Sequence, residues 1–346
     1  MKIAMIADLH FGIKKGNEIF LASQEKFFKE QLVPELEEKG IKDLWILGDV
    51  FDTRSTLSVM VINRVIDLFK NTLGGFTIKI IVGNHDMYLT TDTGINSLKI
   101  LDLLPNVTVY ESPEILHIDG KKILMLPWIT DYTDLSGIPK GHFDYCFCHA
   151  DIIGFDMGGG ILSESGLTAK ELLKRFDTVY AGHYHNGVHR QFEPGKSVTY
   201  LGAPYQLTRI DRGGTRGYHI LDIATGEREL FENRMSMKFT KHTYPDADRS
   251  VVAGNVVDLD IPYEYSDQFK KITKYVEELE KLKPAYPVNI NFLPSSDTEE
   301  EMSIDTSTLN IITLFQKYID QLETKVDKKK LYETFLELYN AYKEQG

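Results

Sequence analysis

The sequence predicts a layered α/β protein that is followed by a small α+β unit and a C-terminal pair of helices. Three observations support this prediction. Short apolar runs that end in polar residues recur through the first 240 residues, segments with helical spacing separate the first of these runs, and a charged stretch near residue 295 precedes two amphipathic segments. Alternation of strands and helices is typical of α/β folds, in which helices cover the faces of a sheet.

The apolar runs have the length and composition of buried strands. They are KIAMIAD (2–8), DLWILGD (43–49), TIKIIVGN (77–84), KKILMLPW (121–128), DYCFCHA (144–150) and DTVYAGH (177–183). Helical spacing over roughly 18–39 and 57–73 separates the first three runs and predicts two helices. Later strands at 198–203, 217–223 and near 228–233 follow one another through turns, so we expect that part to be antiparallel.

A second unit is expected from residue 241. NVVDLDI (255–261), a helical segment over about 264–283 and PVNINFL (287–293) predict a small β-α-β arrangement. The polar stretch SSDTEEEMS (295–303) is typical of a linker, and two segments with apolar stripes at helical spacing follow it. We therefore divide the chain into a first domain (1–240), a second domain (241–294), a linker (295–306) and a helical pair (307–346).

Composition restricts the class of protein. The 346-residue chain is 42% hydrophobic, which is enough for a core without disulfides, and its two cysteines, Cys146 and Cys148, are expected to be buried thiols on one strand. A net charge of −12 argues against a broad basic surface for nucleic acid. No apolar segment approaches the length of a membrane span or a signal-peptide core, so we expect no membrane association and a cytoplasmic location.

Candidate metal-binding residues lie at the ends of the predicted strands. Five of the six predicted strands are followed by residues that can bind a metal: Asp8, His10, Asp49, Asn84, His85, His149, His183 and His185. Any one histidine there is more often structural than a ligand, but the joint pattern lies at the edge where open α/β sheets bind ligands. Oxygen and nitrogen donors without thiolate suit manganese, iron, zinc or magnesium. These residues are too many for one ion, so we expect two ions that share a carboxylate, with Asp49 as the natural bridge.

These motifs resemble a known superfamily. ADLH (7–10), GDVFD (48–52), GNHD (83–86), His149 and GHYH (182–185) are similar, in order, to the five motifs of the calcineurin-like metallophosphoesterases. Within the superfamily, ADLHFG, GDVFDTR and YLGAPYQLTRIDRGGTRGYHILD (200–222) resemble the SbcD-type nucleases, the meiotic recombination eleven family, and especially their tailed-bacteriophage members, the recombination endonuclease subunits. The resemblance implies a β-sandwich flanked by helices, a small α+β capping domain that faces DNA, and a C-terminal helical pair.

The resemblance also implies roles for individual residues. One metal would be held by Asp8, His10, Asp49 and His185, and the other by Asp49, Asn84, His149 and His183. Manganese is expected first, with magnesium, iron or zinc as alternatives. His85 would contact the scissile phosphate and protonate the departing oxygen. Asp52 matches the position that orients this histidine in related phosphatases, and a surface or helix-capping aspartate is the alternative.

The implied function is a metal-dependent DNA exonuclease or endonuclease. It would process duplex ends, hairpins or single strands in recombination, repair or replication, inside a bacterium or a phage-infected host cell. The main alternative is a phosphatase or cyclic-nucleotide phosphodiesterase, which would use the same motifs but would have little need of the extra domains. A non-catalytic scaffold is disfavoured because all seven ligand positions and His85 are filled.

Partners are implied by the C-terminal segments. The helical pair would bind the coiled-coil base of an SbcC-type ATPase, because two short helices alone bury too little to be stable; folding back onto the chain is the alternative. The family implies a homodimer within a heterotetramer, and the helix at 57–73 either forms that interface or packs on the sheet.

Three features have open interpretations. The loop GFDMGGGILSESG (154–166) is either a rim that shapes access to the metals or a plain surface loop. Lys14, Lys15 and Arg54 either contact DNA phosphates or are scattered solvated cations. Asp86 has no role in the expected chemistry and is predicted to stabilise its turn.

Overall fold

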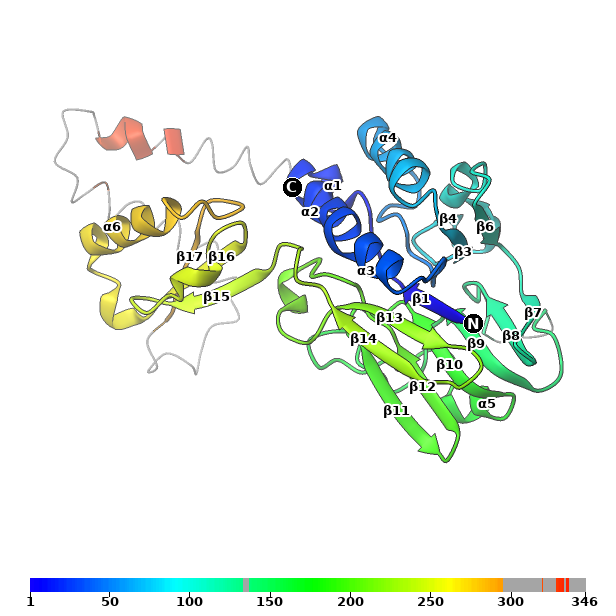
Figure 1. Ribbon diagram of the computed structural model, residues 1–346. Helices are drawn as coiled ribbons and strands as arrows, with labels where there is room; N and C mark the ends of the chain where they lie inside the picture. Colours follow the sequence, from blue (N-terminus) through cyan, green and yellow to red (C-terminus); the bar gives the residue numbers. More distant parts are fainter. Residues whose placement is uncertain (133–136, 295–318, 320–327, 333, 336–346) are drawn as a thin grey trace. The chain divides into compact units, whose positions relative to one another are not determined.

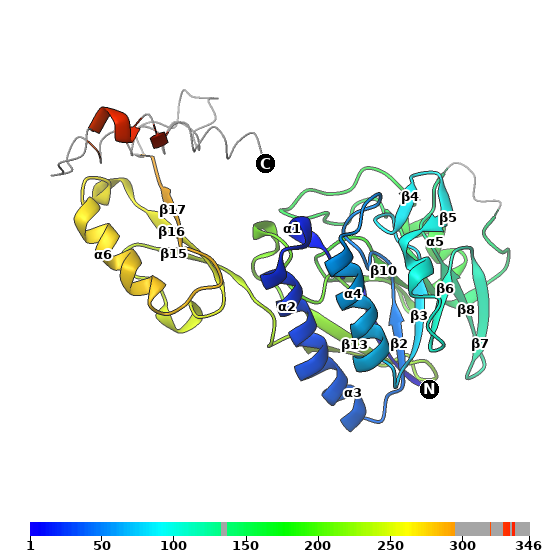
Figure 2. The same cartoon turned by 90° about the horizontal axis from the view of Figure 1, so that it is seen from above.

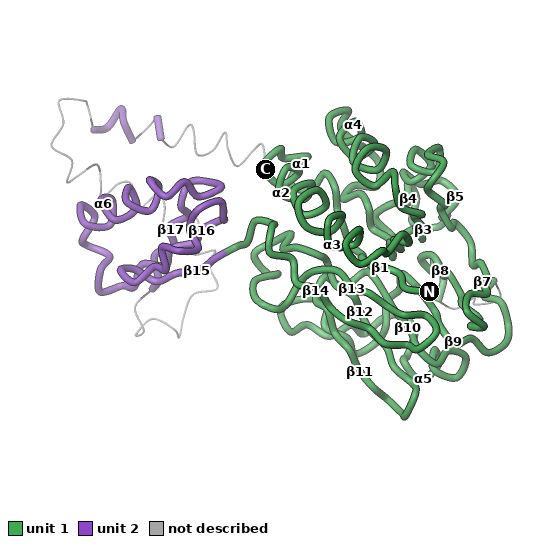
Figure 3. Tube along the Cα trace, in the orientation of Figure 1, with its two compact units in different colours: residues 1–239 green, residues 240–346 purple. Residues whose placement is uncertain are grey.

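The computed structural model describes residues 1–132, 137–294, 319, 328–332 and 334–335. The chain forms two compact units, Met1–Phe239 and Thr240–Gly346 (Figure 3). Within the described residues, no helix has both the length and the apolar character that a membrane span requires.

Unit 1 contains two six-stranded sheets (Figure 1). The first has the order β14-β13-β1-β2-β3-β6, formed by β1 (Lys2–Ile6), β2 (Asp43–Ile46), β3 (Thr77–Ile81), β6 (Val107–Tyr110), β13 (Gly217–Asp222) and β14 (Arg228–Glu232). The second has the order β11-β12-β10-β9-β8-β7, formed by β7 (Glu114–Ile118), β8 (Lys121–Leu126), β9 (Phe143–His149), β10 (Phe176–Gly182), β11 (Val188–Glu193) and β12 (Lys196–Tyr200).

The strands in the middle of each sheet are parallel. This holds for β1, β2, β3 and β6 in the first sheet and for β8, β9, β10 and β12 in the second. β13 pairs antiparallel with β1 and β14, as expected, whereas β12 is antiparallel to β11 but parallel to β10. Parallel strands present their carboxyl ends at one edge, so the polar residues that follow them are brought together.

The main core lies between the two sheets. Met5, Trp45 and Ile81 of the first sheet share one buried cluster with Phe147 and Tyr180 of the second. The rings of Trp45 and Phe147 meet edge to face with centroids 4.7 Å apart, a favourable arrangement for buried aromatic side chains. The predicted α/β sandwich is therefore confirmed.

Helices cover the outer face of each sheet. On the first sheet these are α2 (Glu18–Phe27), α3 (Val33–Glu38) and α4 (Val59–Asp67), as Figure 1 and Figure 2 show. π-helical turns at Phe28–Leu32 and Leu68–Thr72 extend α2 and α4, so the two helices predicted from spacing are present. On the second sheet, α5 (Ala169–Leu173) packs in the outer cluster that also buries both free cysteines, as predicted.

Shorter elements connect these layers. They are the irregular turn α1 (Ile13–Gly16), the hairpin strands β4 (Met87–Leu89) and β5 (Asp92–Asn96), and 3₁₀ turns at Ser97–Ile100 and Arg209–Asp211. The side chain of Asn17 accepts hydrogen bonds from two backbone N–H groups at the start of α2, and the Ser58 hydroxyl accepts one, from Val61, at the start of α4.

Unit 2 is built on a three-stranded sheet in the order β15-β16-β17. Its elements are β15 (Phe239–Thr243), β16 (Val256–Ile261), α6 (Phe269–Glu280) and β17 (Asn289–Phe292), with 3₁₀ turns at Arg249–Val251 and Tyr263–Tyr265. β16 and β17 are parallel and α6 connects them, which is the β-α-β arrangement that the sequence predicts. Val257, Leu259 and Ile261 pack with Ile272 and Leu279 of α6. The predicted linker lies outside the described residues, as does most of the predicted helical pair.

Candidate metal centre

The predicted site residues come together where the carboxyl ends of both sheets meet. Asp8 and His10 follow β1, Asp49 and Asp52 follow β2, Asn84 and His85 follow β3, His149 ends β9, and His183 and His185 follow β10. These side chains include three groups, and within each group the ligand atoms lie within 4.8 Å of one another. The groups are Asp8, His10 and Asp49; Asp49, His149 and His183; and His10, Asp52 and His85.

The backbone at these strand ends is strained. Asp8, His10 and Asp49 adopt φ angles of 56°, 46° and 53°, a region that side chains other than glycine rarely occupy. Such conformations cost about 1–3 kcal/mol each and persist where the surrounding structure enforces them, often at functional sites. Glycine is required at Gly83, because a Cβ there would lie 2.3 Å from Oδ1 of Asp49.

One set of donors lies around Asn84. Its Oδ1 atom is 3.0 Å from Nε2 of His149 and 2.9 Å from Nδ1 of His183. Nε2 of His149 is also 3.3 Å from Oδ2 of Asp49. Two ligands at right angles around an ion with bonds of about 2.1 Å lie about 3.0 Å apart, so this spacing fits a shared ion.

A second set lies on the other side of Asp49. Nε2 of His10 is 3.7 Å from the same Oδ2 of Asp49 and 3.2 Å from Nε2 of His185. These two ring nitrogens can form a hydrogen bond only if one of them carries a proton. If neither does, both are acceptors, and a cation bound by both would give each lone pair a partner. Oδ2 of Asp8 is buried and has no hydrogen-bond partner among the described residues. The donor set therefore fits a metal, and Oδ2 of Asp49 lies near donors of both sets.

Outer contacts orient the histidine rings so that one nitrogen of each faces the centre. Nδ1 of His149 donates a hydrogen bond to the carbonyl of Leu47, at 2.7 Å. Nε2 of His183 lies 2.9 Å from Oδ1 of Asp151, which also accepts a hydrogen bond from the hydroxyl of Tyr184. Contacts of this kind set the tautomer of metal-binding histidines and raise their basicity.

Two carboxylates that support the histidines, Asp151 and Asp211, were not predicted from the sequence. Asp151 follows His149 by two residues, and Asp211 lies 3.7 Å from Nδ1 of His185. Arg216 in turn lies 3.5 Å from Asp211. Burial opposes ionisation of Asp211, but His185 and Arg216 outweigh it and lower its pKa to about 2. A strand-end pattern identifies candidate ligands, but it does not distinguish a supporting carboxylate from other aspartates of the chain.

The electrostatics of the centre favour a cation. Burial opposes ionisation of Asp49, yet His149 and His10 overcome it and hold the pKa of this carboxyl well below its usual range. Burial lowers the pKa of His149, but Asp49 outweighs burial and raises this pKa to about 10. The Asp49 carboxylate therefore favours positive charge beside it, which a proton on His149 or a bound cation can supply.

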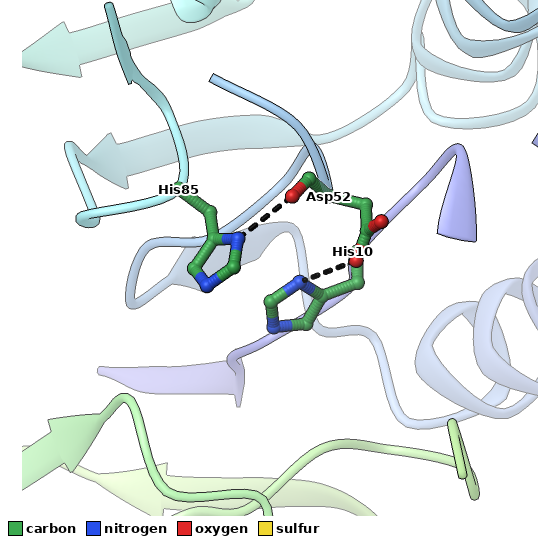
Figure 4. A group of neighbouring side chains, drawn as sticks. All are labelled: His10, Asp52 and His85. Atoms are coloured by element: carbon green, nitrogen blue, oxygen red, sulfur yellow. Dashed lines mark hydrogen bonds and ion pairs between the residues drawn. The ribbon is translucent and has the colours of Figure 1, made fainter. Parts of the chain in front are cut away.

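His85 contacts Asp52 in a way that differs from the predicted one (Figure 4). Its Nδ1 atom lies 2.7 Å from the main-chain carbonyl oxygen of Asp52, whereas the Asp52 carboxylate lies 3.3 Å from Nδ1 of His10. The backbone N–H of His85 donates to Oδ1 of Asp49, at 2.8 Å. Burial is the main cause that lowers the pKa of His85, although Asp49 opposes it. His85 is therefore fixed beside His10 and Asp49, with its Nε2 atom pointing away from Asp52.

Asp86 joins two of the loops that carry the site. Its Oδ2 atom accepts hydrogen bonds from the N–H groups of Asp49 and Gly83, at 2.9 and 3.0 Å. Its Oδ1 atom accepts from Val50 and Phe51, at 3.0 and 3.1 Å. Burial and the nearby Asp49 raise the pKa of this fully buried carboxyl to about 7. Asp86 thus holds the loop after β2 against the loop after β3, a wider role than the local turn predicted for it.

Comparison with known proteins gives two similarities. The family model described as calcineurin-like phosphoesterase matches residues 1–187, which contain all nine predicted site residues. Exonuclease subunit 1 of Enterobacteria phage T4 is 27% identical to this chain over 348 residues, and the alignment covers 98% of each protein.

Proposed function

The chain belongs to the calcineurin-like phosphoesterase family, and from this premise we propose that it is a metal-dependent DNA nuclease. The observation that carries the proposal is the pair of donor sets that share Asp49, with His85 beside His10 and Asp49. The similarity along almost its whole length to a protein named an exonuclease subunit supports DNA as the substrate.

We assign the donors to two divalent ions. Asp8, His10, Asp49 and His185 would hold one, and Asp49, Asn84, His149 and His183 the other. When bound, such ions neutralise charge on a phosphodiester and lower the pKa of water, so that a nucleophile is available at neutral pH. The mixed nitrogen and oxygen donors suit manganese, with magnesium, iron or zinc as alternatives.

The protein's own residues would orient the substrate and move a proton. Nδ1 of His85 is engaged by the Asp52 carbonyl, so proton exchange is left to Nε2. A phosphate anion at Nε2 favours the protonated ring and counteracts the burial that lowers the pKa of His85 in the free protein. Protonated His85 would then contact a phosphate oxygen and donate its proton to the departing oxygen.

Replacement of His85 by alanine tests this role. We expect the variant to bind two Mn²⁺ ions with unchanged affinity in calorimetry and to lose about 10²–10⁴-fold in cleavage of linear duplex DNA, the range for general acid catalysis. His117→Ala is the matched control, because His117 lies on the edge strand β7, away from the strand ends that form the site. Loss of both metals, or full activity, would contradict the role.

The substrate is tested separately with the unaltered protein. Rates on linear duplex DNA plus Mn²⁺ are compared with rates on a nitrophenyl phosphodiester, a phosphomonoester and a cyclic nucleotide. Preference for DNA supports the nuclease. Cleavage of the small esters with no cleavage of DNA would instead establish the phosphatase or cyclic-nucleotide phosphodiesterase alternative.

We also propose that the protein acts within a larger complex. The similar phage protein is named a subunit, which supports a partner. The segments beyond unit 1 would serve as a DNA-facing capping domain (241–294), a linker (295–306) and a helical pair (307–346) that binds an SbcC-type ATPase, with two nuclease chains in a heterotetramer. Deletion of 304–346 should abolish co-purification with the ATPase and leave metal binding intact. Undiminished co-purification would refute this function for the helical pair.

A further inference from the structure

An exposed apolar cluster lies on two segments that border the metal centre. Met157, Ile161 and Leu162 are 51%, 67% and 53% exposed, and Ile210 is 67% exposed. Single exposed apolar residues are common on protein surfaces, but a group of them in one place indicates an interaction site. We call these four side chains the apolar rim.

The loop that carries three of the four residues is firmly built. The backbone N–H of Met157 donates to the carbonyl of Ile161 at 2.8 Å, and Oδ1 of Asp156 accepts from the N–H groups of Gly158 and Gly160 at 2.8 and 3.2 Å. Phe155 anchors the base of the loop, since its buried ring packs on Tyr200 with centroids 5.1 Å apart.

The two segments of the rim meet at the tip of the loop. A Cβ placed on Gly158 would lie 3.5 Å from Cγ2 of Ile210, and one on Gly159 would lie 3.7 Å away. Gly158, Gly159 and Gly160 all have positive φ angles, which only glycine adopts without strain. The loop therefore turns tightly against Ile210 and exposes Met157 and Ile161 at its tip.

The rim is tied directly to residues that support the metal ligands. The loop leaves the site at Asp151, which contacts His183, and Ile210 precedes Asp211, which contacts His185. Two arginines lie near the apolar rim. Arg209 is exposed next to Ile210. Arg190 lies over the Phe155 ring at 4.3 Å and donates a hydrogen bond to the carbonyl of Gly154. The rim thus lies on the His183 and His185 side of the site.

We propose that the apolar rim inserts between the bases at the end of duplex DNA and separates the terminal pairs, so that one strand can reach the metal centre. This inference rests on the proposed nuclease function. Isoleucine, leucine and methionine are among the side chains that proteins use as wedges between base steps, and arginines beside them suit the flanking phosphates. Four side chains offer too little area for a stable protein interface, and a phosphate backbone alone would not require apolar contacts.

The test compares two DNA substrates and two variants of the full chain. Ile161→Ser with Ile210→Ser shortens the rim at exposed positions, and Leu103→Ser is the control, because Leu103 is 82% exposed and lies on a segment that carries no predicted site residue. The substrates are a blunt duplex and the same duplex with unpaired terminal bases, both with Mn²⁺. We expect the double variant to cleave the blunt duplex about tenfold or more slowly, because unstacking a base step costs a few kcal/mol, and the frayed duplex within about twofold of the unaltered protein.

A second readout does not depend on cleavage. With 2-aminopurine in the terminal base pair and no metal added, the unaltered protein and the Leu103 variant should raise the fluorescence, and the double variant should not. An equal loss of cleavage on both substrates, no loss on either, or a fluorescence rise with the double variant would overturn the proposal. If the unaltered protein cleaves neither DNA, the proposed function fails, and fluorescence alone decides for or against base separation.

Discussion

Replacement of Asp86 by asparagine should weaken the site without altering any predicted metal ligand. The carboxylate accepts four backbone hydrogen bonds, two on each oxygen. Asparagine retains one acceptor oxygen and turns an NH₂ group toward the other two N–H donors. Two hydrogen bonds are therefore lost and two buried donors are left without an acceptor.

The expected loss of stability follows from these contacts. A buried donor that loses its partner costs about 1–3 kcal/mol, so two such donors lower the free energy of unfolding by about 2–6 kcal/mol. The comparison is best made at pH 8, because burial and Asp49 raise the pKa of Asp86 to about 7 and the carboxyl is ionised above it. The same loops carry Asp49, Asn84 and His85, so affinity for Mn²⁺ should fall with stability.

Urea unfolding followed by tryptophan fluorescence measures the effect. The chain has two tryptophans: Trp45 is buried between the sheets, and the ring of Trp128 lies 4.9 Å from that of His183. Asp144→Asn is the control, because its carboxylate is 32% exposed, and we expect a change of about 1 kcal/mol or less. If Asp86→Asn unfolds at the same urea concentration as the unaltered protein and binds Mn²⁺ equally well, Asp86 does not stabilise the contact between the loops after β2 and β3.

Three further predictions concern the contacts around the ligands. Asp151→Asn removes the carboxylate that orients His183 and should weaken Mn²⁺ binding about 10–100-fold in calorimetry, whereas Glu164→Gln on the same loop should not; equal affinities would show that Asp151 is dispensable. Asp52→Asn should weaken Mn²⁺ binding through His10 but leave the pH profile of cleavage unchanged, because His85 contacts the main chain of Asp52; a shifted profile would contradict this. Because Asp49 raises the pKa of His149 to about 10, His149 holds a proton at pH 7.5 that metal binding must displace, so the binding heat should differ between buffers of different ionisation enthalpy; identical heats would exclude proton release.

The strand ends were predictable because each combines two strong local signals. An apolar run that stops at Asp8, Asp49 or Asn84 marks both a buried strand and the residue that follows it. Parallel pairing then brings these residues to one edge, so the sequence predicts which side chains gather. The order of strands in the second sheet could not be predicted in the same way. β12 is parallel to β10 and antiparallel to β11, and the residues of β12 do not indicate either direction.

The sequence by itself determined the α/β class, the gathering of nine candidate site residues and the β-α-β unit that follows, because all of these depend on residue type and local spacing. Only the tertiary structure decided that the Asp52 carboxylate contacts His10, that Asp151 contacts His183 across 32 positions and that Asp86 binds four backbone N–H groups. The physical reason is the nature of the partner. A backbone N–H or carbonyl is the same at almost every position of the chain, so only the folded arrangement determines which of them a buried side chain contacts.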